Sequence, residues 1–344
     1  MPGRDVLDER DAPARAREAV GERGAEDAGA DELHTLMARR ALDLWRELDP
    51  ALVAQAGMAW FARGEEGWAV DSERTLRKLG IPVERVDARD LFPSVNVDDL
   101  AFTLFEPEAG ILHARVAVRK LAERAVGAGA RMVVARAKPE GGAVRLDDGT
   151  LLEGDRVVWA CGAWLPALFG DLLDLRITQQ DVFYFGADGR WATPRVPGWV
   201  DYDGSAYGLG DLDGRGVKVA PDIDGPPFDP DRGERVPRPE HEARARAYLA
   251  HRFPALAGAP LVGARVCQYE ITPDTRFVVA PHPEHDGRVW LVGGGSGHAF
   301  KHGPALAERL ERWIGGDEEP EAAFALGQRR RDIALRTAGT ASPY

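Results

Sequence analysis

The sequence has little cysteine, little lysine and no long apolar segment. It contains 344 residues but only two cysteines, Cys161 and Cys267, which are too few and too far apart for a disulfide framework. We therefore expect a reduced, cytoplasmic environment. No run of about 18 apolar residues occurs, so no membrane span is expected. The first 20 residues lack an apolar core, which argues against a signal peptide.

The chain also lacks an excess of basic charge. Lysine and arginine number 44 and aspartate and glutamate 56, which gives a formal net charge of −12. This balance argues against a non-specific nucleic-acid binder, which would need a basic face. Only five of the basic residues are lysines, among them Lys218 and Lys301. At about 150 residues per domain, the length predicts two domains.

Helix and strand patterns alternate along most of the chain. Apolar residues at a spacing of three to four predict helices over 32–48, 71–79, 114–127, 239–252 and 298–314. Apolar or alternating runs predict strands over 58–64, 101–112 with its turn, 131–135, 156–160, 181–186, 216–220, 263–271, 276–281 and 288–294. This order predicts an α/β plus α+β fold with discontinuous domains.

Three segments have more specific patterns. Residues 1–30 hold few large apolar side chains, so they are predicted to be disordered or a frayed helix. Asp148-Gly149 lies between two short apolar runs, 144–146 and 150–152, which is typical of a hairpin. The continuous apolar run 156–160 favours a buried parallel strand.

The glycine-rich segment 293–303 follows a predicted strand and opens a predicted helix. Glycines let the backbone approach a ligand closely, and a helix N-terminus offers unpaired N–H groups and a positive dipole end. A ligand with a negative or electron-rich edge would fit there. The spacing does not match G-x-G-x-x-G, because the third position is His298 or Phe300. A plain tight turn between strand and helix is the alternative.

Two other kinds of chemistry have weaker signals in the same region. His298 and His302 have the i, i+4 spacing that metal sites use, and His282 and His285 lie in a nearby turn. No cysteine accompanies them and no H-E-x-x-H occurs, so solvated turn histidines are the preferred interpretation. Ser296 lies in a segment close to G-x-S-x-G, but the last glycine is displaced by one position, which disfavours a serine hydrolase.

Cys267 and Lys218 each have two interpretations. A lone cysteine in a strand is usually a small buried hydrophobe. Lys218 lies in a strand between Val217 and Val219, so it faces either solvent or a cavity. The residues alone favour solvent.

Taken together and in this order, several segments resemble the D-amino-acid-oxidase-like flavoprotein family, and within it the branch of monomeric sarcosine oxidases and N-methyl-amino-acid oxidases. The matching text is RRALDLWREL (39–48), 105–132, VVWACGAWLPALF (157–169), GVKV (216–219), CQYEITPDTRFVVAPHP (267–283) and GGGSGHAFKHGPALAERL (293–310). The elements C-x-Y-x-x-T-P-D and S-G-H-x-F-K are specific when they occur together. The resemblance covers roughly residues 31–330.

The resemblance implies a discontinuous, Rossmann-like FAD-binding domain and an antiparallel-sheet substrate domain. The FAD-binding domain would comprise 31–50, 111–172 and 262–330, and the substrate domain 51–110 and 173–261. Residues 1–30 would be a disordered or non-native stretch, and 331–344 a C-terminal tail.

The resemblance also implies roles for particular residues. Cys267 corresponds to a cysteine that is linked to the flavin 8α-methyl group, and Lys218 to a lysine that promotes O₂ reduction. Lys301 corresponds to a lysine that pairs with the substrate carboxylate, and Tyr207 and Tyr269 to tyrosines that face the substrate. The residues implied to line the flavin are Gly162, Ala163, Trp164, Gly295, Ser296, Gly297, His298 and Lys301.

The sequence departs from the family pattern in three places. The opening strand, G-x-G-x-x-G, helix and acidic residue that hold the FAD pyrophosphate and ribose are absent. The carboxylate-binding arginine that follows is absent too, and Asp222 stands where the branch commonly has a histidine. The gene start could be misassigned, the protein could be a remnant that does not bind FAD, or a partner could supply the nucleotide-binding half. Without that unit, neighbouring strands would keep open edges.

The resemblance therefore predicts a monomeric FAD-dependent oxidase of small amino acids or secondary amines. A hydride would pass from the carbon next to nitrogen to flavin N5, and O₂ would then be reduced to H₂O₂. The alternatives are a truncated, non-catalytic homologue that cannot hold FAD, and a dehydrogenase of the same fold that uses another electron acceptor.

Overall fold

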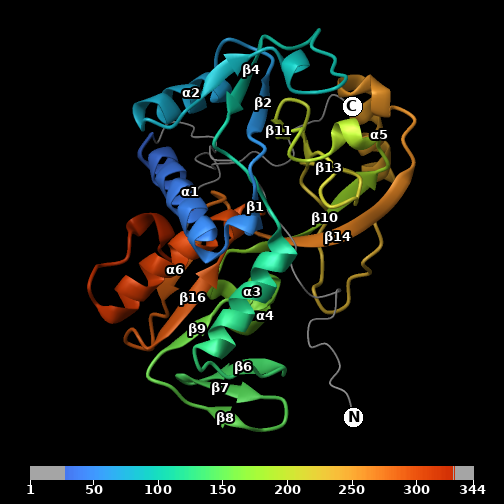
Figure 1. The fold of residues 1–344 in the computed structure, drawn as a ribbon. Helices are drawn as coiled ribbons and strands as arrows, with labels where there is room; N and C mark the ends of the chain where they lie inside the picture. Colours follow the sequence, from blue (N-terminus) through green and yellow to red (C-terminus); the bar gives the residue numbers. More distant parts are fainter. Residues whose placement is uncertain (1–27, 328, 330–344) are drawn as a thin grey trace.

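The computed structural model describes residues 28–327 and residue 329, and its largest element is an eight-stranded sheet (Figure 1). The strand order is β14-β10-β13-β12-β11-β2-β4-β3, and the β11–β2 pair is the parallel one among these neighbours. The strands are β2 (Met58–Ala62), β3 (Glu84–Val86), β4 (Phe102–Glu106), β10 (Arg176–Phe185), β11 (Gly198–Asp201), β12 (Ala206–Leu209), β13 (Val217–Pro221) and β14 (Leu261–Ile271).

Three smaller sheets accompany it. One has the order β15-β16-β9, with β15 (Val278–Pro281) antiparallel and β9 (Val157–Trp159) parallel to β16 (Val289–Gly293). The others are β6 (Ala137–Glu140), β7 (Ala143–Leu146) and β8 (Leu151–Leu152), and the pair β1 (Val53–Ala54) and β5 (Ile111–Leu112). The α-helices of the described part are α1 (Ala28–Leu48), α2 (Trp68–Lys78), α3 (Ala114–Gly127), α4 (Leu165–Phe169), α5 (Pro239–Arg252) and α6 (Ala299–Gly315).

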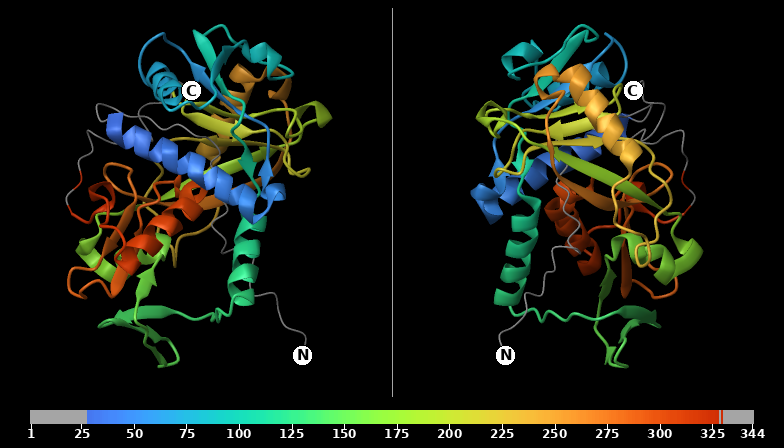
Figure 2. Two further views of the ribbon diagram at one scale, coloured as in Figure 1. Left: turned by 60° about the vertical axis from the view of Figure 1, so that its left-hand side comes forward. Right: turned by 90° about the vertical axis from the view of Figure 1, so that its right-hand side faces the viewer.

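The eight-stranded sheet buries one face beneath α5, as the right-hand view of Figure 2 shows. Phe183 and Val219 on that face are fully enclosed and pack with Tyr248 and Leu249 of α5. Alternation along β10 and β13 sends the intervening side chains to the opposite face. That opposite face is therefore the one available to a functional site.

A second core lies between α1 and α6. The apolar stripe of α1, which includes Met37, Ala41 and Trp45, packs with Leu306 and Trp313 of α6. The predicted amphipathic helix over 32–48 is thus confirmed. Gly316 ends α6 in the left-handed conformation, with φ of +81°, which a glycine adopts without steric cost.

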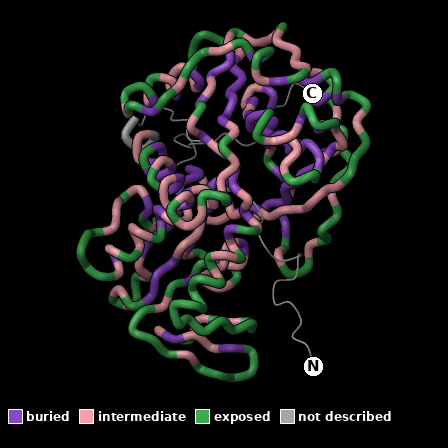
Figure 3. Tube along the Cα trace, in the orientation of Figure 1, coloured by how far each residue is buried: buried purple, intermediate pink, exposed green. Residues whose placement is uncertain are grey.

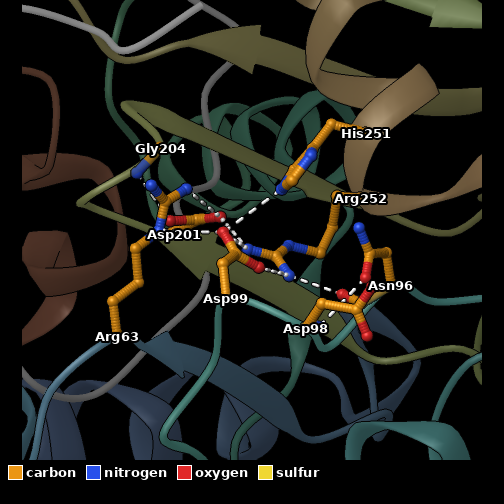
Figure 4. A network of polar contacts seen from close by, with 8 residues as sticks. All are labelled: Arg63, Asn96, Asp98, Asp99, Asp201, Gly204, His251 and Arg252. Carbon is orange, nitrogen blue, oxygen red and sulfur yellow. Dashed lines mark hydrogen bonds and ion pairs between the residues drawn. The ribbon is translucent and has the colours of Figure 1, made fainter.

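A buried ion-pair network joins α5 to the large sheet (Figure 4). The Arg252 guanidinium, which is fully enclosed, donates to Asp99 at 2.8 and 3.1 Å and to Asp201 at 3.1 Å. Arg63 and His251 also contact Asp99. Burial alone would raise the pKa of Asp99, but these partners hold it below its usual range. The network neutralises carboxylates that would be costly to bury alone.

One predicted strand is not formed. Residues 131–136 belong to no strand, and the side chains of Met132, Val133 and Val134 are exposed. In Figure 2 this segment crosses from α3 to β6 with no strand beside it, and Figure 3 shows it as exposed. An apolar run forms a strand only where a neighbouring strand supplies hydrogen bonds, and the described residues give one here at the end of the segment, from the Asp147 N–H to the Arg136 carbonyl.

The other strand predictions of this region are confirmed in part. The hairpin around Asp148-Gly149 is present, with Val144 paired to Leu152. The run 156–160 forms β9, which is parallel to β16 as predicted, but Val158 is 42% exposed. Within the described part of the chain β9 is an edge strand, so the expectation of a buried strand is wrong.

Other expectations lie outside what this structure tests. The prediction for residues 1–30 falls mostly outside the described residues, because the description begins with α1 at Ala28. The tail 331–344 also lies outside them. The boundaries of the two domains stay a prediction.

Candidate functional site

The strand register places Lys218 and Cys267 on the same face of the eight-stranded sheet. Lys218 is directly opposite Tyr184 of β10, and Cys267 is directly opposite Gln180 of the same strand. Opposed residues share a face, and so do residues an even number of positions apart along a strand. This is the face opposite α5. By the same register it also carries Tyr207, Tyr269, Trp60 and Glu106.

Lys218 is buried, with 7% of its surface exposed, so the prediction that it faces solvent is wrong. Its Nζ lies 5.0 Å from the ring centroid of Tyr207, in cation–π range. The mid-strand position that favoured solvent fits burial equally well, because Val-Lys-Val reads the same in either case.

Cys267 is a half-buried free thiol beside the same tyrosine. It packs against a small cluster formed by Tyr207, Val182 and Ala220. The structure therefore brings together Lys218, Tyr207 and Cys267, which lie up to 60 positions apart in the chain.

Tyr269 connects this face to the glycine-rich loop. A Cβ at Gly297 would lie 2.4 Å from the Tyr269 ring, and Gly297 has φ of +79°, so a side chain is excluded there. Gly294 also has a positive φ, of +68°. The loop thus lies directly against β14 because its glycines permit the approach.

Ser296 anchors the loop and does not resemble an exposed nucleophile. Its hydroxyl is buried and donates to the Gly294 carbonyl at 3.0 Å, and its N–H donates to the Glu270 carbonyl at 2.9 Å. A nucleophile elbow would present the hydroxyl to a substrate. The geometry therefore gives no support to a serine hydrolase.

The histidines of α6 are core residues, so their interpretation as solvated turn residues is wrong. His298 and His302 are 2% and 0% exposed and pack with His34 and Phe277. His298 Nε2 lies 2.8 Å from the Thr275 carbonyl. No group of three or more histidine, cysteine or acidic side chains in the described part of the chain could hold a metal ion.

Lys301 lies in the first turn of α6, and a carboxyl group from the large sheet lies near it. Glu106, at the end of β4, is fully buried and accepts a hydrogen bond from Trp60 Nε1 at 2.7 Å. Burial raises the pKa of Glu106 to about 8, while the Trp60 hydrogen bond and the Lys301 charge act in the opposite direction. Sequence reasoning missed Glu106, although its position in the matching segment FEPEAG was visible.

Gly162, Ala163 and Trp164 form a 3₁₀ turn directly after β9. Ala163 is buried, and Trp164 Nε1 donates to Asp231 at 3.0 Å. Glu270 extends from β14 toward this turn, since a Cβ at Gly162 would lie 3.8 Å from its Oε2. Sequence reasoning missed Glu270 as well, although it is the one charged residue in the run 266–273.

Asp222, the departure from the family pattern, is buried one residue beyond β13. Its N–H donates to the Ser205 carbonyl at 2.7 Å. Asp222 follows Lys218 by four positions in the sequence. Its role stays a prediction.

The comparison with known proteins identifies the family of this chain. The family described as FAD dependent oxidoreductase (DAO) matches residues 10–313. The chain belongs to this family. Its members among curated proteins include monomeric sarcosine oxidase from Bacillus sp. (strain B-0618), which is 26% identical over 299 residues and is matched over 80% of this chain and 76% of that protein. N-methyl-L-tryptophan oxidase from Escherichia coli O139:H28 (strain E24377A / ETEC) is 24% identical over 301 residues and is matched over 81% of this chain and 79% of that protein.

Solved structures show the same fold. L-proline dehydrogenase from P. horikoshii superimposes with a TM-score of 0.75 at 18% identity, covering 88% of this chain and 85% of that one. NikD, an amino acid oxidase, superimposes with a TM-score of 0.71 at 20% identity, covering 92% of this chain and 88% of that one. The predicted mixed α/β fold is confirmed, with sheets that are mostly antiparallel. None of the described helices is long and apolar enough to cross a membrane.

Proposed function

We propose that this family member is an oxidase of small amino acids or secondary amines that uses FAD and O₂. The observation that carries the proposal is the shared sheet face, on which Lys218, Tyr207 and Cys267 lie together beside the loop that opens α6. The names of the sarcosine and N-methyl-L-tryptophan oxidases point to the same substrate class.

The flavin ring half of FAD fits the residues present. The loop before α6 offers backbone N–H groups at a helix N-terminus, and the Cys267 thiol is half-buried on the adjacent strand. Gly162–Trp164 would line the other side. Oε2 of Glu270 is buried without a hydrogen-bond partner in the described part of the chain, as expected of a group that faces a ligand. A thioether at Cys267 is part of the proposal.

The nucleotide half of FAD has no matching loop in the sequence. No G-x-G-x-x-G occurs anywhere in the 344 residues. The fit is therefore limited to the ring, the thioether and the helix N-terminus, and affinity for FAD would depend on these groups.

The side chains of this chain would bind and polarise the substrates. Lys301 would pair with the substrate carboxylate, and the nearby Glu106 would compete with that carboxylate when it is ionised. Tyr207 and Tyr269 would form walls of the substrate site. FAD, when bound, would accept the hydride from the carbon next to nitrogen. Lys218 would hold a fixed positive charge that stabilises the anion formed when O₂ is reduced.

The test is oxygen consumption by the FAD-incubated protein with sarcosine and N-methyl-L-tryptophan as probes. Lys218→Met should lower the rate with O₂ by about 100-fold, while the rate with an artificial electron acceptor changes little. Lys138→Met, on the exposed strand β6, is the matched control and should leave both rates unchanged. An unchanged O₂ rate in active Lys218→Met would remove the role of Lys218.

A non-catalytic protein that does not retain FAD is the second candidate. It is favoured by the absence of G-x-G-x-x-G from the sequence and by the apolar segment 131–135, which forms no strand. Reduction of the artificial acceptor without O₂ consumption would instead favour a dehydrogenase.

A further inference from the structure

The carboxyl group of Glu270 lies between the turn after β9 and the glycine-rich loop before α6, on the side of β14 opposite Cys267 and Tyr269. Its Oε1 accepts a hydrogen bond from the Gly295 N–H at 3.2 Å. Its Oε2 is inaccessible to solvent and accepts no hydrogen bond from any described residue. A buried carboxyl oxygen without a partner is costly, so this group requires either a proton or a ligand.

Two separate segments, the end of β16 with the loop that follows it and the turn after β9, enclose this carboxyl group. A Cβ at Gly293 would lie 3.3 Å from Oε2 and one at Gly295 would lie 3.1 Å from Oε1, while one at Gly162 would lie 3.8 Å from Oε2. The glycines at the end of β16, in the loop before α6 and in the turn after β9 therefore leave the space that the carboxyl group uses. These are the segments that the proposed function assigns to the flavin.

The charged and titratable groups around Glu270 are few. From the turn after β9 the Cys161 thiol faces it, and burial together with the Glu270 charge raises the pKa of that thiol. From β10 the opposed residue is the uncharged Ile177, and α4 contributes Leu165 beside Gly293. On α6, His298 is directed to the Thr275 carbonyl and Lys301 interacts with Glu106.

Among the described residues, no cation acts on the Glu270 carboxylate. Burial raises the pKa of Glu270 to about 7, against the lowering effect of the N–H groups of Gly295 and Gly294. The group changes its charge near neutral pH. The Gly295 N–H belongs to the loop that precedes α6 and is a donor that an electron-rich ligand edge could also use.

We propose that Glu270 makes flavin binding depend on its own charge, with the neutral acid permitting binding and the carboxylate opposing it. The carboxylate competes for the Gly295 N–H and places a negative charge beside the electron-rich pyrimidine edge of the flavin. The neutral acid releases that N–H more readily and can itself donate a hydrogen bond. This inference rests on the proposed function, since it concerns the same site.

The test is a titration of the flavin-free protein with FAD, followed by quenching of flavin fluorescence at pH 6 and pH 8. A Cys267→Ser background keeps the binding reversible. The Kd should be about fivefold higher at pH 8 than at pH 6 if binding raises the pKa of Glu270 by about one unit. Glu270→Gln should show nearly equal Kd values at the two pH values, and Glu270→Asp should keep the dependence.

Glu284→Gln, in an exposed turn, is the matched control and should behave like the parent protein. A Kd that is the same at both pH values in the parent protein overturns the inference without any Glu270 variant. A pH dependence that persists in Glu270→Gln overturns it as well. FAD binding that is independent of pH leaves the proposed function intact, whereas no FAD binding by any variant at either pH contradicts both.

Discussion

The eight-stranded sheet and the region around 131–136 contain similar apolar sequences but differ in packing. Val219 of β13 is fully buried between two paired strands, whereas Val134 is 76% exposed and has no strand beside it. Figure 3 shows the same contrast along the chain, with buried segments concentrated in the large sheet and exposed ones around α3 and β6–β8.

The difference shows that an apolar run needs a neighbour before it can form a buried strand. In the large sheet every strand except those at its two ends has two partners, and α5 covers one face. In the other region β9 has one partner, and residues 131–136 belong to none of the described strands. Stability is therefore concentrated in the large sheet, and the following changes test that contrast.

The largest loss of stability is expected from substitution of Arg252, which links α5 to the large sheet. Arg252→Met leaves Asp201 buried without its closest cation, because Arg63 lies farther away, at 3.6 Å. Loss of one partner of a buried pair costs about 3–5 kcal/mol. Chemical denaturation should show this loss in the free energy of unfolding.

Arg190→Met provides the comparison for that experiment. Arg190 pairs with Asp188 on the surface, where a salt bridge contributes at most about 1 kcal/mol. Equal losses for the two variants would show that the network of Figure 4 adds nothing to the stability of the sheet.

Glu106 should make the stability of the large sheet depend on pH. Its carboxyl group keeps its proton up to about pH 8 in the folded protein but loses it near pH 4.5 when unfolded. The unfolded state therefore binds fewer protons between these values, and stability falls as the pH rises through this window. Glu106→Gln should reduce that fall, by on the order of 3–4 kcal/mol between pH 5 and pH 8.

The measurement is the free energy of unfolding of both proteins across this pH range. Glu284→Gln serves again as the exposed control and should leave the slope unchanged. Parallel curves for Glu106→Gln and the parent protein would contradict the raised pKa of Glu106.

The smallest effects on the free energy of unfolding are expected from a valine-to-alanine substitution made in each of the two regions. Val219→Ala removes two buried methyl groups and should cost about 2 kcal/mol, including the cavity that remains. Val134→Ala removes the same atoms from an exposed side chain and should change stability by less than about 0.5 kcal/mol. Equal losses would mean that residues 131–136 are packed against a neighbour.

The sequence predicted most elements because their signals are local. The spacing of apolar residues in 32–48 and 114–127 is enough to identify α1 and α3, and Asp148-Gly149 is enough for the hairpin. The strand over 131–135 was predicted by the same kind of signal, but its formation depends on a partner strand, which local patterns do not contain.

The candidate site was predicted unevenly for a similar reason. The resemblance identified Lys218, Cys267 and Tyr207, and the register brings them to one face. The burial of Lys218 could not be read from Val-Lys-Val, because the pattern is the same whether a sheet face meets water or another layer. Glu106 and Glu270 were missed because their importance comes from burial and from contacts distant in the sequence.

The most direct test of the flavin site is the absorbance spectrum of the purified protein between about 300 and 550 nm, before and after acid precipitation. A flavin spectrum that stays with the precipitate is the predicted result, because the Cys267 thiol lies on the sheet face beside the loop before α6. Flavin released to the supernatant would contradict the thioether at Cys267. A colourless, folded protein that also fails to take up added FAD would contradict the proposal that this sheet face and loop form a flavin site.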